Sequence, residues 1–220
     1  MRFFKKKREM NIKYILGEIL LLFVGINLAI WFNNWNSSNQ INDDKAVAIS
    51  RIIEEIDNNV LELDSIMLNN SHILKSFEDY KNFYDGSTAQ LRMSPIKYDS
   101  LKKIHPKFFR LEDSIAVENG EFRYLGTTYI NLEITTLTEI AWQTTTTLNV
   151  SHEFSYDCLY ELESLYNLQR RVQDEINKSA NALQNRELLE LMHILEFLEQ
   201  LGTQLQESYA DMVVKIETCS

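Results

Sequence analysis

Tyr14-Ile-Leu-Gly-Glu-Ile-Leu-Leu-Leu-Phe-Val-Gly-Ile-Asn-Leu-Ala-Ile-Trp-Phe32 is the stretch that decides the fold of this 220-residue chain. As a helix it would be about 28 Å long, close to the thickness of the hydrocarbon core of a bilayer. The run ends in Trp31-Phe-Asn-Asn-Trp35 and not in a small-residue cleavage site, which favours an uncleaved membrane anchor over a signal peptide. Tyr14 at one end and Trp31 and Trp35 at the other are the predicted interfacial anchors.

Charge predicts how this span is oriented. Six basic residues lie at or before residue 13, and none lies between Tyr14 and Asp44. The positive-inside rule therefore predicts a basic cytoplasmic head at 1–13, a transmembrane helix at 14–35 and an exported domain at 36–220. With those six residues, Glu9 and Glu18 set aside, 16 basic and 30 acidic residues remain, a net charge near −14. Such an acidic domain repels phosphate, which argues against nucleic-acid binding.

Polar and small residues inside the span are candidates for contacts with another membrane helix. Glu18 and Asn27 are polar groups in an apolar run, and Gly25 and Ala29 form a small-xxx-small pair that lets two helices approach closely. Glu18, Gly25 and Ala29 share one helix face, whereas Asn27 points elsewhere. Glu18 lies about one turn from the cytoplasmic edge, so simple placement at the interface is the alternative to a contact role.

The apolar pattern after the anchor predicts a long helix. No Gly or Pro occurs between Gly25 and Gly86, so the span can continue into this helix, with a loose joint at 33–42. Apolar positions alternate at spacings of four and three residues, interrupted by Asn70, a pattern that suits either a bundle core or an intermolecular coiled coil. The members of this seam are Ile49, Ile53, Ile56, Val60, Leu63, Met67, Asn70, Leu74, Phe77, Lys81 and Tyr84.

Further helices are predicted near the C-terminus. Heptad-like runs at 158–183 and 188–216, separated by a short polar turn near Gln184-Asn185, predict an antiparallel hairpin. Another helix is expected from Thr135 to Leu148, with Leu137, Ile140, Ala141 and Leu148 facing inward. The predicted fold is mainly α: an N-terminal transmembrane helix followed by an antiparallel bundle of about four helices.

Residues 85–132 differ in composition from the helical segments on either side and predict a small irregular insertion. Both prolines and three of the six glycines, Gly86, Gly120 and Gly126, fall here. We expect a short helix near 98–104 and a strand pair, 121–125 with 129–134, joined by Gly126-Thr-Thr. Phe108, Phe109 and Tyr124 are candidates for an exposed partner surface, and the alternative is that they plug the far end of the bundle.

Catalytic and metal-binding patterns are not evident in the sequence. There is no phosphate-binding glycine loop, nucleophile elbow or paired-histidine zinc signature. Glu190-Leu-Met-His193 resembles half of a di-iron motif, but no other histidine has a Glu three residues before it. We therefore expect no enzyme activity and no cofactor.

The two cysteines are expected to remain unpaired. Folding the C-terminal hairpin about residue 185 places Cys158 beside residue 211. Cys219 then overshoots by about 12 Å along a straight helix, beyond the reach of a disulfide. A bridge would require the C-terminal tail to fold back.

The span and its flanks resemble a known family. Tyr14, Gly17-Glu18-Ile19, Gly25-Ile26, Leu28-Ala29 and Asn33-Asn34-Trp35-Asn36 are similar to the opening of a family of uncharacterised single-pass membrane proteins of Bacteroidota. Ala141-Trp142 and the tyrosine-rich helix that follows resemble that family's second segment more loosely. The resemblance implies an inner-membrane anchor and a periplasmic helical domain, and it implies no activity.

Two functions fit these features. The first is an interaction or scaffold protein of the cell envelope that contacts the lipid bilayer and forms a homo-oligomer or joins an envelope complex. The second is an exported ligand-sensing module. Only about 13 residues precede the span, so a sensor of this kind would have to signal through a partner membrane protein.

Overall fold

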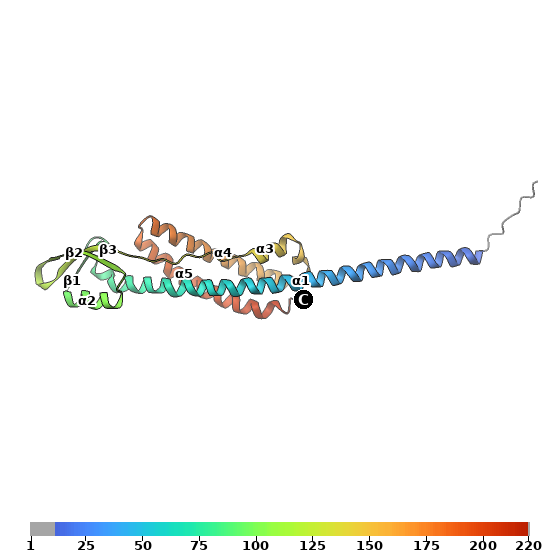
Figure 1. The fold of residues 1–220 in the computed structure, drawn as a ribbon, viewed down its shortest axis with the longest axis horizontal. Coiled ribbons are helices and arrows are strands. Elements are labelled where there is room, and N and C mark those ends of the chain that lie inside the picture. Colours follow the sequence, from blue (N-terminus) through green and yellow to red (C-terminus); the bar gives the residue numbers. More distant parts are fainter. Residues whose placement is uncertain (1–11, 220) are drawn as a thin grey trace, which may run out of the picture.

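The computed structural model describes residues 12–219, so nearly all of the predicted basic head lies outside the described residues. Helix α1 (Ile12–Tyr80) is 69 residues long. Its first part projects as a bare rod from a body built by the rest of the chain (Figure 1). Within the described residues, this is the one helix long and apolar enough to cross a membrane, and the body covers none of its apolar stretch.

Helix α1 connects the apolar rod to the body without a break. The loose joint predicted at 33–42 is wrong, because α1 remains helical throughout this segment. Its Asn and Ser residues have lower helix propensity than Ala or Leu, but no Gly or Pro interrupts them. The direction that each face of the rod points is therefore coupled to the orientation of the body.

The predicted C-terminal hairpin is present as α4 (Tyr156–Gln184) and α5 (Leu188–Ile216). Ser155 caps α4 by accepting a hydrogen bond from Cys158 N. The chain reverses next to Arg186, whose φ of 64° is left-handed. Helix α5 packs against both α4 and the second half of α1.

The predicted fourth long helix is largely replaced by an extended segment. Residues 129–139 have no helical structure, and α3 (Ile140–Thr147) has only 8 residues. Leu137 is buried as expected, but Ile140 and Leu148 are each 67% exposed, so their predicted inward orientation is wrong. Threonines weaken α3 because they are β-branched. The bundle of about four helices is not confirmed: the described body has three long helices.

Asparagines on α1 bind the backbone of the extended segment at two points. Asn59 donates to Thr138 O (2.7 Å) and accepts from Thr138 N (2.8 Å). Asn70 makes the same pair of bonds with Glu133 O (3.2 Å) and Glu133 N (3.1 Å). The spacings match, because 11 helical residues and 5 extended residues both cover about 16.5 Å. The two side chains thus replace the neighbouring strand that this backbone lacks.

Helix α4 holds the other side of the same segment. Gln169 Nε2 donates to Thr138 O (2.8 Å), and Leu137 N donates to Gln173 Oε1 (2.8 Å). Tyr209 of α5 donates to Gln169 Oε1 (2.8 Å), which orients that amide. The extended segment therefore lies between α1 and α4. We call Asn59, Asn70, Gln169 and Gln173 the amide clasp.

The clasp widens the buried face of α1. The predicted seam is only one edge of that face, since Ile49, Ile53 and Val60 are partly buried. The fully buried positions also include Ile52 and Ile66. Helix α1 is covered by α5 on one side and by the extended segment on the other, so the seam belongs to the core of this chain and not to a free coiled-coil face.

A small sheet and a short helix cap the end of the body farthest from the rod (Figure 1). Strands β1 (Gln90–Met93), β3 (Phe122–Thr128) and β2 (Phe109–Ala116) form an antiparallel sheet in the order β1-β3-β2. Helix α2 (Pro95–Ile104) agrees with the predicted short helix. The predicted strand pair is wrong, because Gly126-Thr-Thr lies inside β3 and not in a turn. A Cβ at Gly126 would lie 2.1 Å from Arg110 O, so this position needs glycine for close strand approach.

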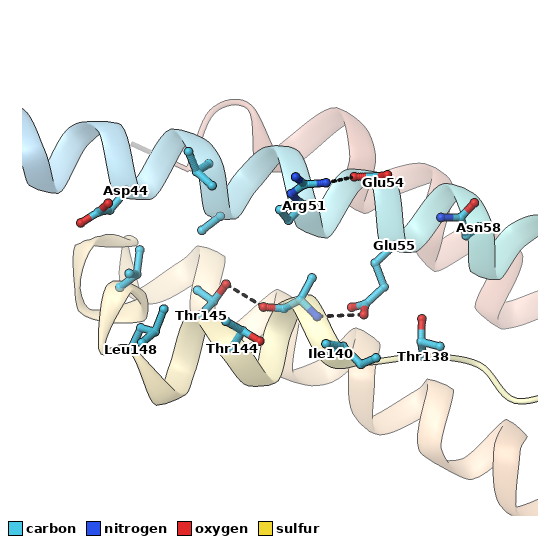
Figure 2. A pocket seen from close by; sticks show the side chains of 14 residues that line it. Asp44, Arg51, Glu54, Glu55, Asn58, Thr138, Ile140, Thr144, Thr145 and Leu148 are labelled. Carbon is cyan, nitrogen blue, oxygen red and sulfur yellow. Dashed lines mark hydrogen bonds and ion pairs between the residues drawn. The ribbon is translucent and has the colours of Figure 1, made fainter.

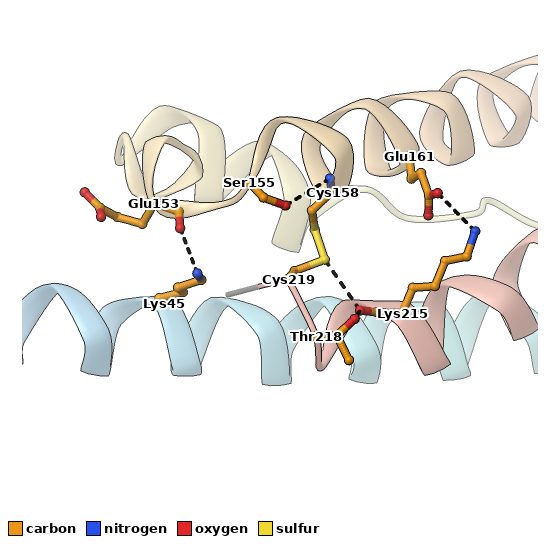
Figure 3. The surroundings of a disulfide bond; sticks show 8 residues. All are labelled: Lys45, Glu153, Ser155, Cys158, Glu161, Lys215, Thr218 and Cys219. Carbon is orange, nitrogen blue, oxygen red and sulfur yellow. Dashed lines mark hydrogen bonds and ion pairs between the residues drawn. A yellow bond between two sulfur atoms is a disulfide. The ribbon is translucent and has the colours of Figure 1, made fainter.

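Cys158 and Cys219 form a disulfide, with Cα atoms 5.5 Å apart (Figure 3). The prediction of unpaired cysteines is wrong because it extended α5 to the C-terminus as a straight helix. Helix α5 ends at Ile216, and Thr218 N and Cys219 N donate to Lys215 O and Ile216 O in a turn. That turn brings Cys219 back onto the first turn of α4.

The amide clasp can be tested with a matched pair of neighbouring asparagines. Asn59→Ala is expected to lower the free energy of unfolding by about 2 kcal/mol, because Thr138 N loses its side-chain acceptor and Thr138 O keeps only the bond from Gln169. Asn58→Ala is the control, since Asn58 is exposed, and should change it by less than about 0.5 kcal/mol. Denaturant unfolding followed by circular dichroism measures both. Equal effects would contradict the role of the clasp.

The disulfide predicts a stability that depends on redox state. Replacing Cys158 and Cys219 by Ser should lower the free energy of unfolding by about 4 kcal/mol, since the bond closes a loop of 61 residues. Addition of dithiothreitol should destabilise the natural protein by a similar amount and leave the double variant unchanged. Two titratable thiols in the oxidised, natively folded protein would show the pairing to be wrong.

Candidate functional site

One face of the apolar rod combines a carboxylate with small residues. Glu18, Gly25 and Ala29 are separated by seven and four residues, so they follow one side of α1. Leu21 and Leu22 flank them, and the hollow over this face measures about 780 Å³. The rod thus has a shallow stripe of small residues with an ionisable group near one end.

This face is open in the single chain. A Cβ added at Gly17 or Gly25 would meet no atom within 4 Å, and the Glu18 side chain is exposed. The small residues therefore do not accommodate any part of the body. If they serve close packing, the packing partner is another helix.

Asn27 differs from Glu18 in that one hydrogen bond to its own helix already engages its side-chain amide. Its Nδ2 donates to Phe23 O at 2.7 Å, within the same helix. It lies nine residues from Glu18, about 2.5 turns away, and so faces the opposite side. The structure separates Asn27 from the other three predicted contact residues.

The predicted interfacial anchors all lie on α1. Trp31 and Trp35 are 63% and 52% exposed, and Phe32 packs against Trp35 with ring centroids 5.9 Å apart. Tyr14 lies in the first turn of α1, and its side chain is outside the described part. The two tryptophans mark one end of the apolar stretch.

Phe108, Phe109 and Tyr124 do not form an exposed surface. They are 6%, 2% and 6% exposed, so their prediction as exposed aromatics is wrong. Tyr80, at the end of α1, packs on Phe108 at 5.3 Å, and Tyr98 stacks on Tyr124 at 4.0 Å. Burial raises the pKa of Tyr80 to about 12. These aromatics join the sheet and α2 to the end of α1. This agrees with the alternative prediction, in which they plug the far end of the bundle.

A groove between α1 and α3 was not predicted from the sequence (Figure 2). It measures about 750 Å³ and lies near the point where the rod leaves the body. Val47 on one wall and Ile140 and Leu148 on the other are 60%, 67% and 67% exposed. These last two residues were predicted to face a core. Because α3 is short, they border an open groove instead.

Glu55 forms part of the groove lining and is only 7% exposed. Its Oε2 accepts from Ala141 N at 2.9 Å, and its Oε1 accepts from Tyr166 OH at 2.8 Å. Tyr166 stacks on Trp142 of α3 with an interplanar angle of 5°. Burial, and then the nearby Glu55 charge, raise the pKa of the Tyr166 hydroxyl. A fixed carboxylate therefore links the groove to the core.

A serine, a histidine and an aspartate meet at the opposite end of the body. His105 Nδ1 lies 2.9 Å from Ser76 Oγ, and His105 Nε2 lies 2.7 Å from Asp79 Oδ2. Ser76 is 7% exposed and donates to His72 O, 2.7 Å away. A nucleophilic serine needs an accessible oxygen and a proton free for the base. This arrangement instead fastens the loop after α2 to the end of α1.

The described residues offer no metal centre. Groups of three or more His, Cys, Asp or Glu side chains placed to hold an ion do not occur among residues 12–219. Glu190 and His193 are both exposed on α5. Comparisons with protein-family models, curated proteins and solved structures find no match. The open rod face and the groove are therefore the two candidate functional sites among the described residues.

Proposed function

We propose that this protein is a membrane-anchored interaction or scaffold protein of the cell envelope, without catalytic activity of its own. The rod of α1 would span the inner membrane, with the N-terminus in the cytoplasm and the body in the periplasm. Its partners would be the lipid bilayer and either further copies of the chain or an envelope complex. The observation that carries this proposal is the open face formed by Glu18, Gly25 and Ala29.

Glu18 is the residue of the rod that would gain most from a partner helix. An ionisable side chain facing lipid at the centre of a membrane helix costs about 2.5–3.5 kcal/mol, and less near the edge. A partner helix that packs against Gly25 and Ala29 would cover Glu18 and offer it polar groups. Asn27 is neutral and already donates one hydrogen bond to Phe23 O, so it depends less on a partner helix.

The disulfide and the charge pattern support export of the body. Disulfides persist in oxidising compartments such as the bacterial periplasm and are rare in the cytosol. The Cys158 and Cys219 side chains lie in the body, and the basic residues before the span favour a cytoplasmic N-terminus. Two independent features therefore agree on the same topology.

A second candidate function is an exported ligand-sensing module. The groove between α1 and α3 favours it, since its volume of about 750 Å³ lies in the range of small-molecule sites. Because α1 is continuous, a ligand that shifts α1 relative to α3 would act on the same helix that spans the membrane.

The scaffold proposal predicts assembly through the rod. The natural protein in mild detergent should have the mass of a defined oligomer or complex, and a version lacking residues 1–40 should be monomeric. Glu18→Leu and Gly25→Leu should each lower the association constant about tenfold, since close packing and an interhelical polar contact contribute about 1–2 kcal/mol. Mass photometry measures this constant from the amounts of assembled and monomeric protein.

Asn27→Leu is the matched control, because it removes a polar group from the opposite face and should leave the mass unchanged. A Cβ at Gly25 meets no atom within 4 Å, and the position is exposed on the rod, so a loss of assembly in Gly25→Leu would not come from a clash with the body. A natural protein that is monomeric and purifies without a partner would contradict the proposal.

A further inference from the structure

We propose that the groove between α1 and α3 binds a small cationic amphiphile, meaning an apolar chain or ring that carries an ammonium or guanidinium group. This goes beyond assembly through the rod and can hold or fail independently of it.

Shape and lining favour an apolar ligand body. The groove is bordered by apolar side chains on both walls, with Val47 and Ala48 from α1 and Ile140, Ala141 and Leu148 from the α3 side. Three of these are more than half exposed. Exposed apolar walls are unfavourable in water, so a ligand with an apolar body that covers them lowers the free energy.

Charge selects the head group. Arg51 is the one basic side chain in the lining, and Glu54 pairs with it at 2.7 Å. Asp44 and Glu55 are the other two acidic residues of the lining. In the described structure, neither forms an ion pair with a basic side chain. Glu55 is 7% exposed, and each of its oxygens accepts one bond. A carboxylate oxygen has two lone pairs, so it can accept another donor.

Unpaired carboxylates in an apolar setting favour a cation and disfavour an anion. The ligand head would lie at Asp44, the exposed carboxylate at the rim of the groove, and Glu55, eleven helical residues or about 16.5 Å farther along α1, would add negative potential at the inner end of the lining. The net charge near −14 of the sequence beyond the span adds a field of the same sign. Fatty acids and other anionic amphiphiles are therefore disfavoured as ligands relative to cationic ones of the same size.

The position of the groove suits a ligand that concentrates at a bilayer surface. Asp44 follows Trp35 by nine residues on the same unbroken helix, which is about 14 Å. Lys45 Nζ donates to Glu153 O at 2.7 Å and fastens the loop after α3 to α1 (Figure 3). The groove is thus held open beside the predicted membrane surface by contacts other than those a ligand would use.

The test compares one apolar chain with three head groups. Full-length protein in zwitterionic nanodiscs is titrated with hexylammonium, hexanol and hexanoate, and ligand-observed NMR is corrected with empty nanodiscs. Hexylammonium should bind saturably at about millimolar concentration. Hexanoate should bind about tenfold more weakly, because one screened charge contact near a protein surface supplies roughly that factor. Equal binding of all three, or saturable binding of none, would overturn the proposal.

Variants locate the site. Leu148→Lys puts a competing cation at the wall and should abolish hexylammonium binding, whereas Leu189→Lys is a control at a similarly exposed leucine of α5, which is 65% exposed. Asp44→Asn should weaken hexylammonium about two- to fivefold and leave hexanol unchanged. Circular dichroism checks folding of each variant. Undiminished binding in folded Leu148→Lys would overturn the proposal, whatever the oligomeric mass of the protein.

Discussion

The body depends on a hydrogen-bonding constraint: the extended backbone at 129–139 lies between α1 and α4 with no neighbouring strand. Buried N–H and C=O groups must find partners. Asn59 and Asn70 supply them from α1, and Gln169 and Gln173 supply them from α4. Because 11 helical residues match 5 extended ones, the clasp also sets how far the segment can slide. The start of α3, and with it one wall of the groove, follows from that register.

The continuity of α1 couples the two candidate surfaces. The rod face with Glu18 and the groove wall with Val47 belong to one helix without a hinge. Assembly through the rod would therefore fix the direction in which each groove opens. A scaffold role and a ligand role are compatible, because a ligand between α1 and α3 would act on the helix that carries the assembly face.

Much of the fold was predictable because its signals are local. The apolar run at 14–32 indicates the rod, and the heptad-like spacing at 158–216 indicates the α4 and α5 hairpin. The extended segment was not predictable, since Leu137, Ile140 and Leu148 have helical spacing and their neighbours give no sign of the distant amides that hold the backbone. The burial of Phe108, Phe109 and Tyr124 depends on where α1 ends. The disulfide depends on one turn after Ile216.

The sequence by itself determined the class of the protein: an apolar helix of bilayer length, a basic start, an acidic remainder and long amphipathic helices. Hydrophobic length and period encode these features within one segment. Only the tertiary structure decided which polar side chains replace a missing strand, which cysteines meet and which apolar residues border a groove. Those outcomes depend on contacts between residues far apart in the chain, such as Asn59 with Thr138 and Glu55 with Ala141. No local pattern carries that information.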